Sequence, residues 1–448
     1  MSASVLWFRR DLRLRDHPAL TAAADGPVAG LFVLDPVLWR GAGDARRAWL
    51  AACLRALDEA MGGRLIVRLG DPAVEVPAVV RGVGADRVLV TAESTPYGSA
   101  RDRRVDEALG ETPLEAVGTP YAVPPGTVLN KSGDPYRVFT PFSRAWREVP
   151  LDPPLPAPEV DWVRGETGSD EGALAALREA LADPPCTLPP AGEDAAVDRW
   201  REFVDDDLAD YADARDRPDH DRTSRMSPYL RFGVVHPRQL LHQVRSHRGE
   251  GRRTYDTELA WREFYADVLR HHPASAWADL RPLGLDYDDP APLVRAWAEG
   301  RTGFPVVDAG MRQLLAEGWM HNRVRMITAS FLTKDLHAWW PTGARHFLEH
   351  LIDGDLASNN HGWQWVAGTG TDAAPYFRVF NPVSQGLRFD PDGAYVRRWV
   401  PELAHLGGKA AHEPWRHAAG YEHGYPERIV DHDAERREAL ARYHAARG

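Results

Sequence analysis

The stretch from Asp353 to Pro382 mixes residue types that could hold a flat conjugated ligand. It reads DGDLASNNHGWQWVAGTGTDAAPYFRVFNP, and its aromatic residues are Trp363, Trp365, Tyr376, Phe377 and Phe380. Aromatic faces stack on such a ligand, while short amides and carboxylates reach the heteroatoms at its edge. On these residues alone, an aromatic turn in the core with satisfied polar groups is an equally good interpretation.

A hydroxyl-rich segment, RTSRMSPYL, covers residues 222–230. Thr223, Ser224 and Ser227 precede a predicted helix, and this arrangement suits a phosphate group bound at a helix N-terminus. An ordinary cluster of helix-capping residues is the alternative, and for this segment alone it is the better explanation.

A third segment, ELAWREFY, covers residues 258–265. Its three- and four-residue spacing puts Glu258, Trp261, Arg262 and Tyr265 on one face of a helix. A carboxylate is costly to bury in a core, but it suits a site that grips a polar ring by its edge and stacks on its face. An exposed glutamate beside a core tryptophan is the alternative.

A fourth segment, GWMHNRVRMITASFLTKDL, is an apolar helix pattern interrupted by Asn322, Arg323, Arg325 and Met326. Arg325 could pair with an acid such as Asp353, and Arg323 could meet a phosphate.

The residues from His346 to His350 match the H-x-x-E-H pattern of zinc peptidases. That function needs a third ligand and an open metal position. The surrounding ARHFLEHLIDGD reads better as a helix that leads into the Asp353 stretch. We therefore expect no metal site.

The elements that position these segments follow two different patterns. The first 125 residues alternate strand-like and helix-like runs, for example SVLWFRR, VAGLFVLD, RLIVRLG and DRVLVTAE between helical windows. This alternation predicts an α/β domain with a parallel, doubly wound Rossmann-like sheet. No G-x-G-x-x-G motif follows a strand, so the usual dinucleotide fingerprint is missing.

A segment rich in Pro, Asp and Gly follows and predicts a linker. Beyond it, long helical windows such as VDRWREFVDDDLADYADARD predict a larger all-α domain. We place an α/β domain at 1–130, a linker at 131–195 and a helical domain at 196–448.

Composition limits the possible partners. The 448 residues carry a net charge of −11, so any nucleic-acid site must be a local basic patch. Arginine supplies almost all the positive charge, which suits phosphate contacts but also follows from a GC-rich genome. No run of 18 apolar residues and no signal peptide is visible, and the two cysteines suit a reducing cytoplasm. We expect a cytoplasmic monomer without membrane contact.

These motifs, in this order, resemble the cryptochrome and photolyase family, and within it the class I enzymes that repair cyclobutane pyrimidine dimers. The resemblance runs from LWFRRDLRLRDHPAL through TSRMSPYLRFG, ELAWREFY, TGFPVVDAGMRQL, GWMHNRVRM and LIDGDLASNNHGWQWVAGTGTDAAPYFRVFNP to HEPW. It therefore covers nearly the whole chain.

The resemblance implies an FAD bent into a U within the helical domain. The matching positions are Tyr211, Thr223, Ser224, Arg225, Met226, Ser227, Tyr255, Arg325, Asp353, Gly354, Asp355 and Asn359. Residues 223–227 would hold the diphosphate, although Arg222 stands where the family usually has glycine. Asn359 matches the residue that faces flavin N5, where its side-chain carbonyl can accept the proton of a reduced flavin.

The resemblance also implies UV-damaged DNA as the substrate. Glu258 would hydrogen-bond a flipped dimer that receives one electron from the reduced flavin; extrusion of the damaged nucleotides by photolyases is a general example of base flipping. The positions that match dimer or DNA contacts are Arg215, Glu258, Trp261, Arg262, Asn322, Arg323, Met326, Trp365 and Arg378. A cryptochrome, which signals without repair, is the alternative within the family.

Two further expectations concern electron transfer and light capture. Trp363 and Trp340 match the inner and middle members of a photoreduction relay, and Tyr287 stands at the outermost position, so the route could instead pass through Trp339 or Trp297. An antenna chromophore is expected in the α/β domain. The segment STPYGSARDRR favours an 8-hydroxy-deazaflavin type over folate, and Phe32, Asp35 and Asp102 are candidate contacts.

Overall fold

The computed structural model describes residues 2–165, 167–372 and 377–446. They form two compact units. The first unit consists of residues 1–136, 140–209 and 224–273, and the second of residues 137–139, 210–223 and 274–448. These units are defined by compactness, and the functional domain boundaries of the sequence analysis stay predictions.

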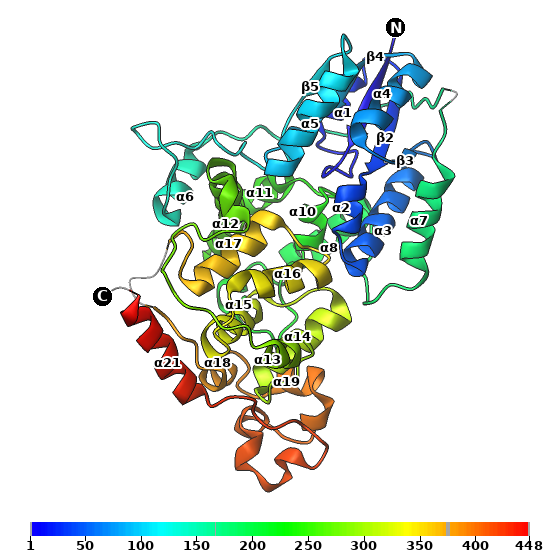
Figure 1. Ribbon diagram of the computed structural model, residues 1–448. Coiled ribbons are helices and arrows are strands. Elements are labelled where there is room, and N and C mark those ends of the chain that lie inside the picture. The colour runs from blue at the N-terminus through cyan, green and yellow to red at the C-terminus, as the bar shows by residue number, and fades with distance from the viewer. Residues whose placement is uncertain (1, 166, 373–376, 447–448) are drawn as a thin grey trace. The chain divides into compact units, whose positions relative to one another are not determined.

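A parallel five-stranded sheet lies at the centre of the first unit (Figure 1). Its spatial order is β3-β2-β1-β4-β5. The strands are β1 (Ala3–Phe8), β2 (Val28–Leu34), β3 (Ile66–Leu69), β4 (Ala85–Val90) and β5 (Leu114–Ala116). The expected alternation of strands and helices is confirmed, because each crossover that returns the chain to a parallel strand contains a helix.

Both faces of this sheet are covered. Helices α4 (Pro72–Val83) and α5 (Pro96–Leu109) share a buried cluster with alternate residues of β1, such as Val5 and Trp7. On the other face, a Cβ added to Gly30 would lie 2.4 Å from Cε of Met61, which follows α3. Helices on both faces make the sheet doubly wound, as the sequence predicts.

The remaining helices of the first unit connect strands of the sheet or follow its last strand along the chain. They are α1 (Pro18–Ala23), α2 (Pro36–Arg40), α3 (Asp44–Ala60), α6 (Phe139–Glu148), α7 (Glu171–Ala182), α8 (Glu193–Asp206), α10 (Ser227–Arg231), α11 (Pro237–Ser246) and α12 (Glu250–His271).

The segment expected to be a linker is more ordered than its composition indicates. It contains α6 and α7, and α7 begins with Asp170 as its N-cap, which accepts a hydrogen bond from Gly172 N at 2.7 Å. Val28 N donates to Asp161 O and Val163 N donates to Val28 O, so this segment also pairs with β2. The apolar residues of α7 provide the reason, because Ala173 is fully buried.

The long helical window around residue 206 is not one helix. Helix α8 ends at Asp206, and the next helix, α9, covers Tyr211–Ala214. Three consecutive aspartates, residues 205–207, place negative charge at the negative end of the helix dipole, and aspartate is also a poor helix former. The window is helical as predicted, and for this reason it is divided into two helices.

The second unit is helical. Its α-helices are α9, α13 (Ala291–Ala298), α14 (Pro305–Glu317), α15 (Asn322–Ser330), α16 (Trp340–His350), α17 (Leu356–Ala367), α18 (Pro382–Phe389), α19 (Ala394–Trp399), α20 (Lys409–His412) and α21 (His432–Ala445). The others are the 3₁₀ helices η1 (Pro273–Ala276), η3 (Pro401–Leu403), η4 (Pro414–Arg416) and η5 (Ala418–Tyr421), and the π-helix η2 (Phe331–Asp335).

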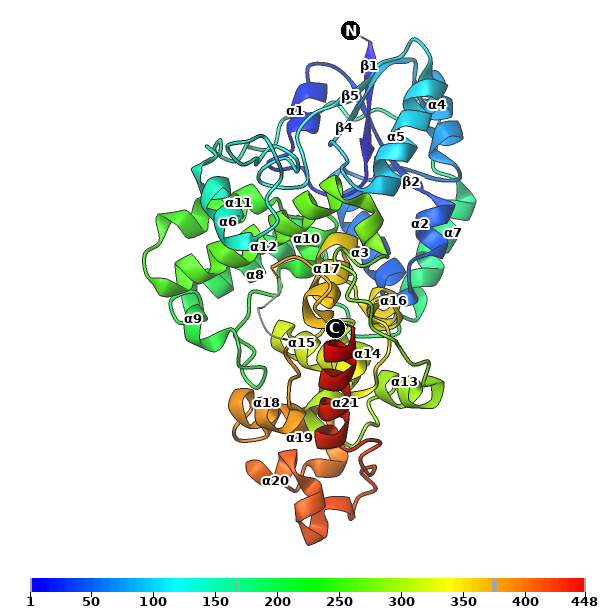
Figure 2. The same ribbon diagram turned by 60° about the vertical axis from the view of Figure 1, so that its left-hand side comes forward.

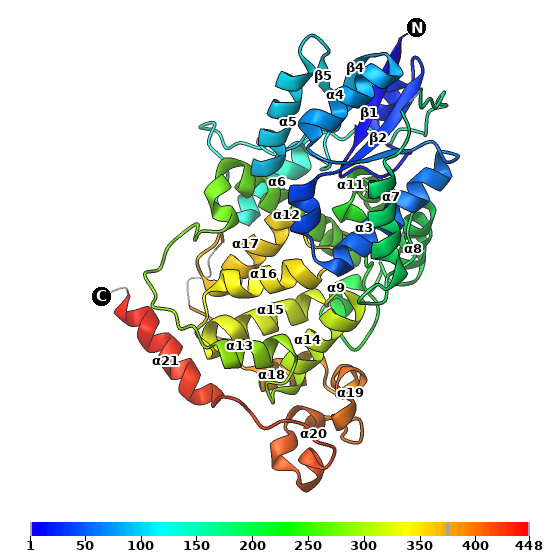
Figure 3. The same ribbon diagram turned by 45° about the vertical axis from the view of Figure 1, so that its right-hand side comes forward.

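The core of the second unit is rich in large aromatic residues. Trp297, Trp340 and Phe347 are buried with Trp363 in one apolar cluster. Helices α16 and α17 lie side by side in Figure 3, and the C-terminal helix α21 packs against η2. Figure 2 shows the C-terminal part of the unit, with α18, α19 and α20 in orange and α21 in red.

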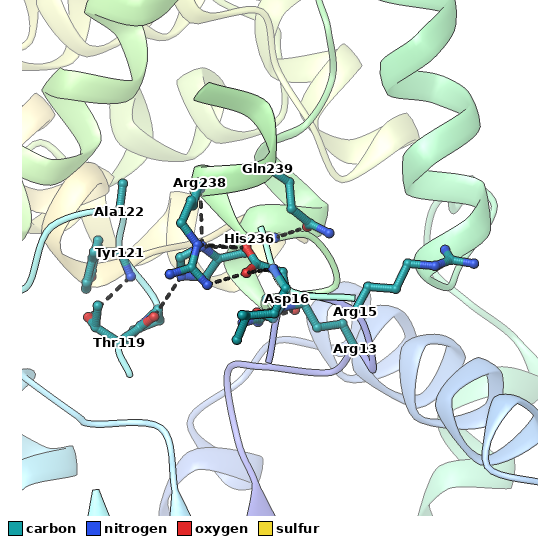
Figure 4. A network of polar contacts seen from close by, with 12 residues as sticks. Arg13, Arg15, Asp16, Thr119, Tyr121, Ala122, His236, Arg238 and Gln239 are labelled. Atoms are coloured by element: carbon teal, nitrogen blue, oxygen red, sulfur yellow. Dashed lines mark hydrogen bonds and ion pairs between the residues drawn. The ribbon is translucent and has the colours of Figure 1, made fainter. Parts of the chain in front are cut away.

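A buried polar network in the first unit joins the loop after β1 to the start of α11 (Figure 4). Asp16, which has a left-handed φ of 52°, pairs with Arg238. His236 caps α11: its Nδ1 accepts a hydrogen bond from Arg238 N at 3.2 Å. Its Nε2 donates to Thr119 O at 2.8 Å. Both ring nitrogens of a neutral imidazole are therefore used.

Stability between pH 6.5 and pH 4 is expected to depend on His236. Burial lowers the pKa of His236 to about 4, and this desolvation outweighs the nearby Asp16 carboxylate. The unfolded histidine binds its proton first as the pH falls through about 6.5, so the free energy of unfolding drops by about 3 kcal/mol by pH 4. Urea unfolding of His236→Gln should show a shallower pH dependence over this window. His247→Gln, which replaces an exposed histidine, should behave like the wild type. Equal slopes for all three proteins would contradict the assignment.

Candidate functional site

The start of α17 is organised by two carboxylates. Asp355 is the N-cap and accepts a hydrogen bond from Ser358 N at 3.0 Å. Asp353 is buried and accepts two hydrogen bonds from Arg325, with Nη1–Oδ1 at 3.2 Å and Nη2–Oδ2 at 2.8 Å. Arg325 Nε also donates to Met320 O at 2.8 Å, so the guanidinium is fixed in one orientation. The predicted Arg325–Asp353 pair is confirmed.

The side-chain amide nitrogen of Asn359 is used in hydrogen bonds, whereas its carbonyl oxygen is left available. Its Nδ2 donates to Ala344 O at 3.1 Å and to Asn360 Oδ1 at 2.8 Å. Asn360 Nδ2 in turn donates to Ala276 O, which fixes the order of donors and acceptors. Within the described part of the chain, no donor contacts Asn359 Oδ1. Asn359 is half-buried, and its Oδ1 therefore offers a hydrogen-bond acceptor.

A set of tryptophans leads from α17 toward the surface of the second unit. Trp363 is 3% exposed and packs over Gly343 of α16, where an added Cβ would meet its Cη2 at 2.1 Å. Trp340, at the start of the same helix, is fully buried, whereas the adjacent Trp339 is 38% exposed. The ring centroids of Trp339 and Trp340 are 6.4 Å apart. Asp279 accepts from both indoles, at 2.7 Å from Trp340 Nε1 and 3.4 Å from Trp339 Nε1.

Tyr287 lies next to this set. Its ring centroid is 6.4 Å from that of Trp339. Burial and the nearby Asp279 carboxylate raise the pKa of Tyr287. Its loop is held by Arg442 of α21, which makes two 3.0 Å hydrogen bonds to Asp288. Tyr287 therefore reaches the tryptophan set through Trp339.

Trp297 is a buried neighbour of Trp363. The ring centroids of Trp297 and Trp363 are 6.1 Å apart, and Trp297 Nε1 donates to Thr328 O at 3.0 Å. Because Trp297 is fully buried, it cannot deliver a charge directly to water.

In the first unit, α12 carries a polar and aromatic surface. Tyr255 Oη and Ser224 Oγ are 3.0 Å apart in a buried contact. Glu258 follows one turn later and is half-buried, as is Trp261. The rings of Trp261 and Tyr265 lie 5.4 Å apart. The helix predicted for ELAWREFY and its shared face are therefore present.

The hydroxyl-rich segment contains a residue in an unusual backbone conformation. Arg225 has a φ of 52°, and Met226 that follows is in the right-handed region. Such a reversal turns successive backbone N–H groups to one side, as anion-binding nests do. In the first unit Ser224 and Met226 are buried and Ser227 is exposed; Thr223 and Tyr211 belong to the second unit.

The arginines predicted to hold DNA phosphates have different surroundings. Arg323 is held by Asp216, with Nη2–Oδ2 at 2.9 Å and Nε–Oδ1 at 3.2 Å, and Arg215 Nε lies 3.8 Å from the same carboxylate. Arg378 is exposed. In the first unit, Arg262 donates to Pro120 O at 3.3 Å, so a phosphate there would have to replace existing hydrogen bonds.

The other predicted dimer contacts lie on helices of the second unit. Asn322 and Met326 are on α15, exposed and half-buried respectively, and Trp365 on α17 is half-buried. Gly354 is buried between Asp353 and Asp355. Tyr376 lies outside the described residues. The roles assigned to all these residues stay predictions.

Three residues that sequence reasoning missed have a clear place in the structure. Asp216 neutralises Arg323, and Asp279 joins two indole N–H groups. Lys334 is buried, donates to Ala367 O at the end of α17 at 2.6 Å, and lies 3.4 Å from the centroid of Phe377. Their partners are distant in sequence, and no local pattern signals such pairs.

Known proteins are similar to this chain in sequence and in architecture. A family model described as the FAD binding domain of DNA photolyase matches residues 255–445, and one described as DNA photolyase matches residues 4–159. The chain is 44% identical to a deoxyribodipyrimidine photo-lyase of Streptomyces griseus, with 100% of both chains covered. The chain belongs to the DNA photolyase family.

Solved structures of the family have the same fold. A class III photolyase of Agrobacterium tumefaciens superimposes with a TM-score of 0.92, at 35% identity, over 100% of this chain and 98% of that one. A cryptochrome of Synechocystis superimposes with a TM-score of 0.89, at 26% identity, over 98% and 99%. The predicted α/β and helical architecture is confirmed. Each helix in the described residues is too short or too polar to cross a lipid bilayer.

The residues around α17 fit the FAD that this family binds. The Asn359 carbonyl oxygen suits the N–H of a reduced flavin ring, because it accepts and cannot donate. The Arg325–Asp353 pair provides charged groups in a fixed orientation, and Asp353 lies two residues before the N-cap of α17. FAD is the cofactor of this family domain.

Proposed function

We propose that this protein is a light-dependent DNA repair enzyme that splits cyclobutane pyrimidine dimers. Bound FAD in its reduced state supplies the light-driven electron. The observation that carries the proposal is the carboxylate of Glu258 on the aromatic surface of α12, one turn from Trp261. Such a surface can stack on a flipped dimer and bind its polar edge at once.

The residues of the second unit have two proposed tasks. Arg325, Asp353 and Asp355 hold and orient the flavin, and Asn359 Oδ1 accepts a hydrogen bond from N5–H, which favours the reduced state. Trp365, Met326 and Asn322 contact the dimer, and Arg215, Arg323 and Arg378 contact phosphates. Arginine suits these contacts because its planar group binds phosphate through two N–H bonds.

The residues of the first unit complete the proposed roles. Ser224, Arg225, Met226 and Ser227 are the proposed diphosphate ligands of this unit, and Tyr255 supports Ser224. Thr223 and Tyr211 of the second unit have the same proposed role. Glu258 hydrogen-bonds the dimer and stabilises the negative charge that it gains. Trp261 stacks on the dimer, and Arg262 binds phosphate after exchanging its carbonyl contacts.

Repair is favoured over cryptochrome signalling by the degree of likeness. The photo-lyase from Streptomyces griseus is 44% identical over its whole length, whereas the cryptochrome structure is 26% identical. A light-dependent assay on DNA that contains thymine dimers distinguishes the two functions. Absence of repair by the reduced, illuminated holoenzyme would support the cryptochrome alternative.

Replacing Glu258 by alanine tests the proposed role directly. A hydrogen bond to a charged group contributes roughly 1.5–3 kcal/mol, so we expect dimer repair to fall about tenfold or more. Glu250→Ala is the matched control, because Glu250 is an exposed glutamate of the same helix that pairs with Arg253. Undiminished repair by Glu258→Ala would refute the role of Glu258.

A second chromophore of the 8-hydroxy-deazaflavin type is proposed at the carboxyl edge of the sheet. Ligands of doubly wound sheets bind at this edge. Asp35, just beyond β2, accepts a 2.5 Å hydrogen bond from Tyr97, and Asp102 accepts two 2.7 Å hydrogen bonds from Arg9, just beyond β1. Phe32 is buried in β2. The absorption and fluorescence excitation spectra of the purified protein would identify the pigment.

A further inference from the structure

The residues His346, Glu349 and His350 on α16 have no part in the proposed repair reaction. They stand at positions i, i+3 and i+4 of one helix and therefore point to the same side. One ligand atom from each lies within 4.8 Å of the others. The centroids of the two imidazole rings are 4.4 Å apart. Two imidazoles and a carboxylate that converge in this way are a donor set for a transition-metal ion.

His346 carries a second indication of a ligand. Its Nε2 is buried and has no hydrogen-bond partner among the described residues. The ring is held in place by Trp297, whose centroid lies 5.3 Å away and whose own Nε1 is fixed by Thr328 O. A buried polar nitrogen without a partner is costly, and a metal ion would satisfy it.

The electrostatic surroundings also favour a cation. The three residues occupy the last turns of α16, which ends at His350, and the C-terminal end of a helix is its negative end. Glu349 adds a carboxylate there.

We infer that His346, Glu349 and His350 bind one divalent transition-metal cation of the Zn²⁺ class, with water completing its coordination. Nitrogen ligands select Zn²⁺, Co²⁺, Ni²⁺ or Cu²⁺ over Mg²⁺ and Ca²⁺. This inference replaces the expectation of no metal site. It does not assign a peptidase function, because the chain belongs to the DNA photolyase family. The cation links the last turns of α16, which ends three residues before Asp353. Because it binds the folded protein, it stabilises the folded state.

The experiment is a titration of the metal-free, flavin-containing full-length protein with Zn²⁺, followed by calorimetry, and with Co²⁺, followed by visible absorption. We expect one equivalent to bind, a higher thermal unfolding midpoint with Zn²⁺, and no displacement by excess Mg²⁺. Glu349→Gln and His350→Gln should each weaken binding at least about tenfold, since even residues outside the ligand set change metal affinity by this much. Glu349 is exposed, so its replacement leaves the fold intact.

A second histidine cluster provides the matched control. His405, Glu422 and His423 also bring their ligand atoms within 4.8 Å of one another, but all three are exposed. The His405→Gln variant should still bind the one equivalent of Zn²⁺ that the His350→Gln variant loses. The inference is overturned if no equivalent binds, if binding survives both Glu349→Gln and His350→Gln, or if His405→Gln alone abolishes it.

Discussion

A protein in which Asp353 is replaced by asparagine is expected to purify without flavin. The neutral amide cannot balance the guanidinium of Arg325, which is only 24% exposed on its side chain. Breaking such a pair costs roughly 3 kcal/mol, the lower end of the range for buried pairs, because water still reaches part of the arginine. The same change removes a proposed flavin contact, so binding and stability should fall together.

The absorption spectrum of the purified variant measures this outcome, together with urea unfolding of wild type and variant after flavin removal. Asp288→Asn is the matched control, because Asp288 accepts two hydrogen bonds from Arg442 in the same unit but is exposed. That variant should keep its flavin. A full complement of flavin in Asp353→Asn would show that the carboxylate is dispensable for cofactor binding.

The Arg325–Asp353 pair was predictable from sequence, whereas its surroundings were not. An arginine within an otherwise apolar helix pattern requires a counter-charge, and Asp353, before the Asn-Asn-His motif, was the candidate. In the α/β region, helix α4 covers PAVEVPAVVRGV, one of the helical windows between the strand-like runs, because Asp71 caps its start and Gly84 ends it with a left-handed φ of 67°. Local chemistry decided the two ends of α4.

Other contacts depend on chain segments that only the fold brings together. Arg262 lies in a family motif, but the structure directs its N–H groups to the carbonyl oxygens of Pro120 and Leu230. Asp279 belongs to an irregular loop and receives the N–H groups of Trp339 and Trp340. Hydrophobic periodicity reports which face of a helix is buried and says nothing about the partner of a long polar side chain.

Tyr287, Trp339 and Trp297 are the sequence-based candidates for the outer member of the photoreduction relay, and their solvent exposure distinguishes them. Trp297 is fully buried, so it leads no charge to solvent. Trp339 is 38% exposed and donates to the Asp279 carboxylate, which stabilises a positive charge on the indole and accepts its proton. Tyr287 must lose its proton to carry the charge, and burial raises its pKa. These differences favour Trp339 over Tyr287 as the outer member.

Replacing Trp340 by phenylalanine is therefore expected to abolish most photoreduction of the oxidised holoenzyme, because the fully buried Trp340 neighbours the exposed Trp339, with ring centroids 6.4 Å apart, and begins the helix against which Trp363 packs at Gly343. Trp339→Phe should slow photoreduction strongly, and Tyr287→Phe should slow it much less. Illumination with an external thiol measures the rates, and transient absorption identifies the radical. Repair by the chemically reduced Trp340→Phe enzyme should continue, since that reaction needs no electron from the tryptophans. A larger loss in Tyr287→Phe than in Trp339→Phe would restore Tyr287 as the outermost member.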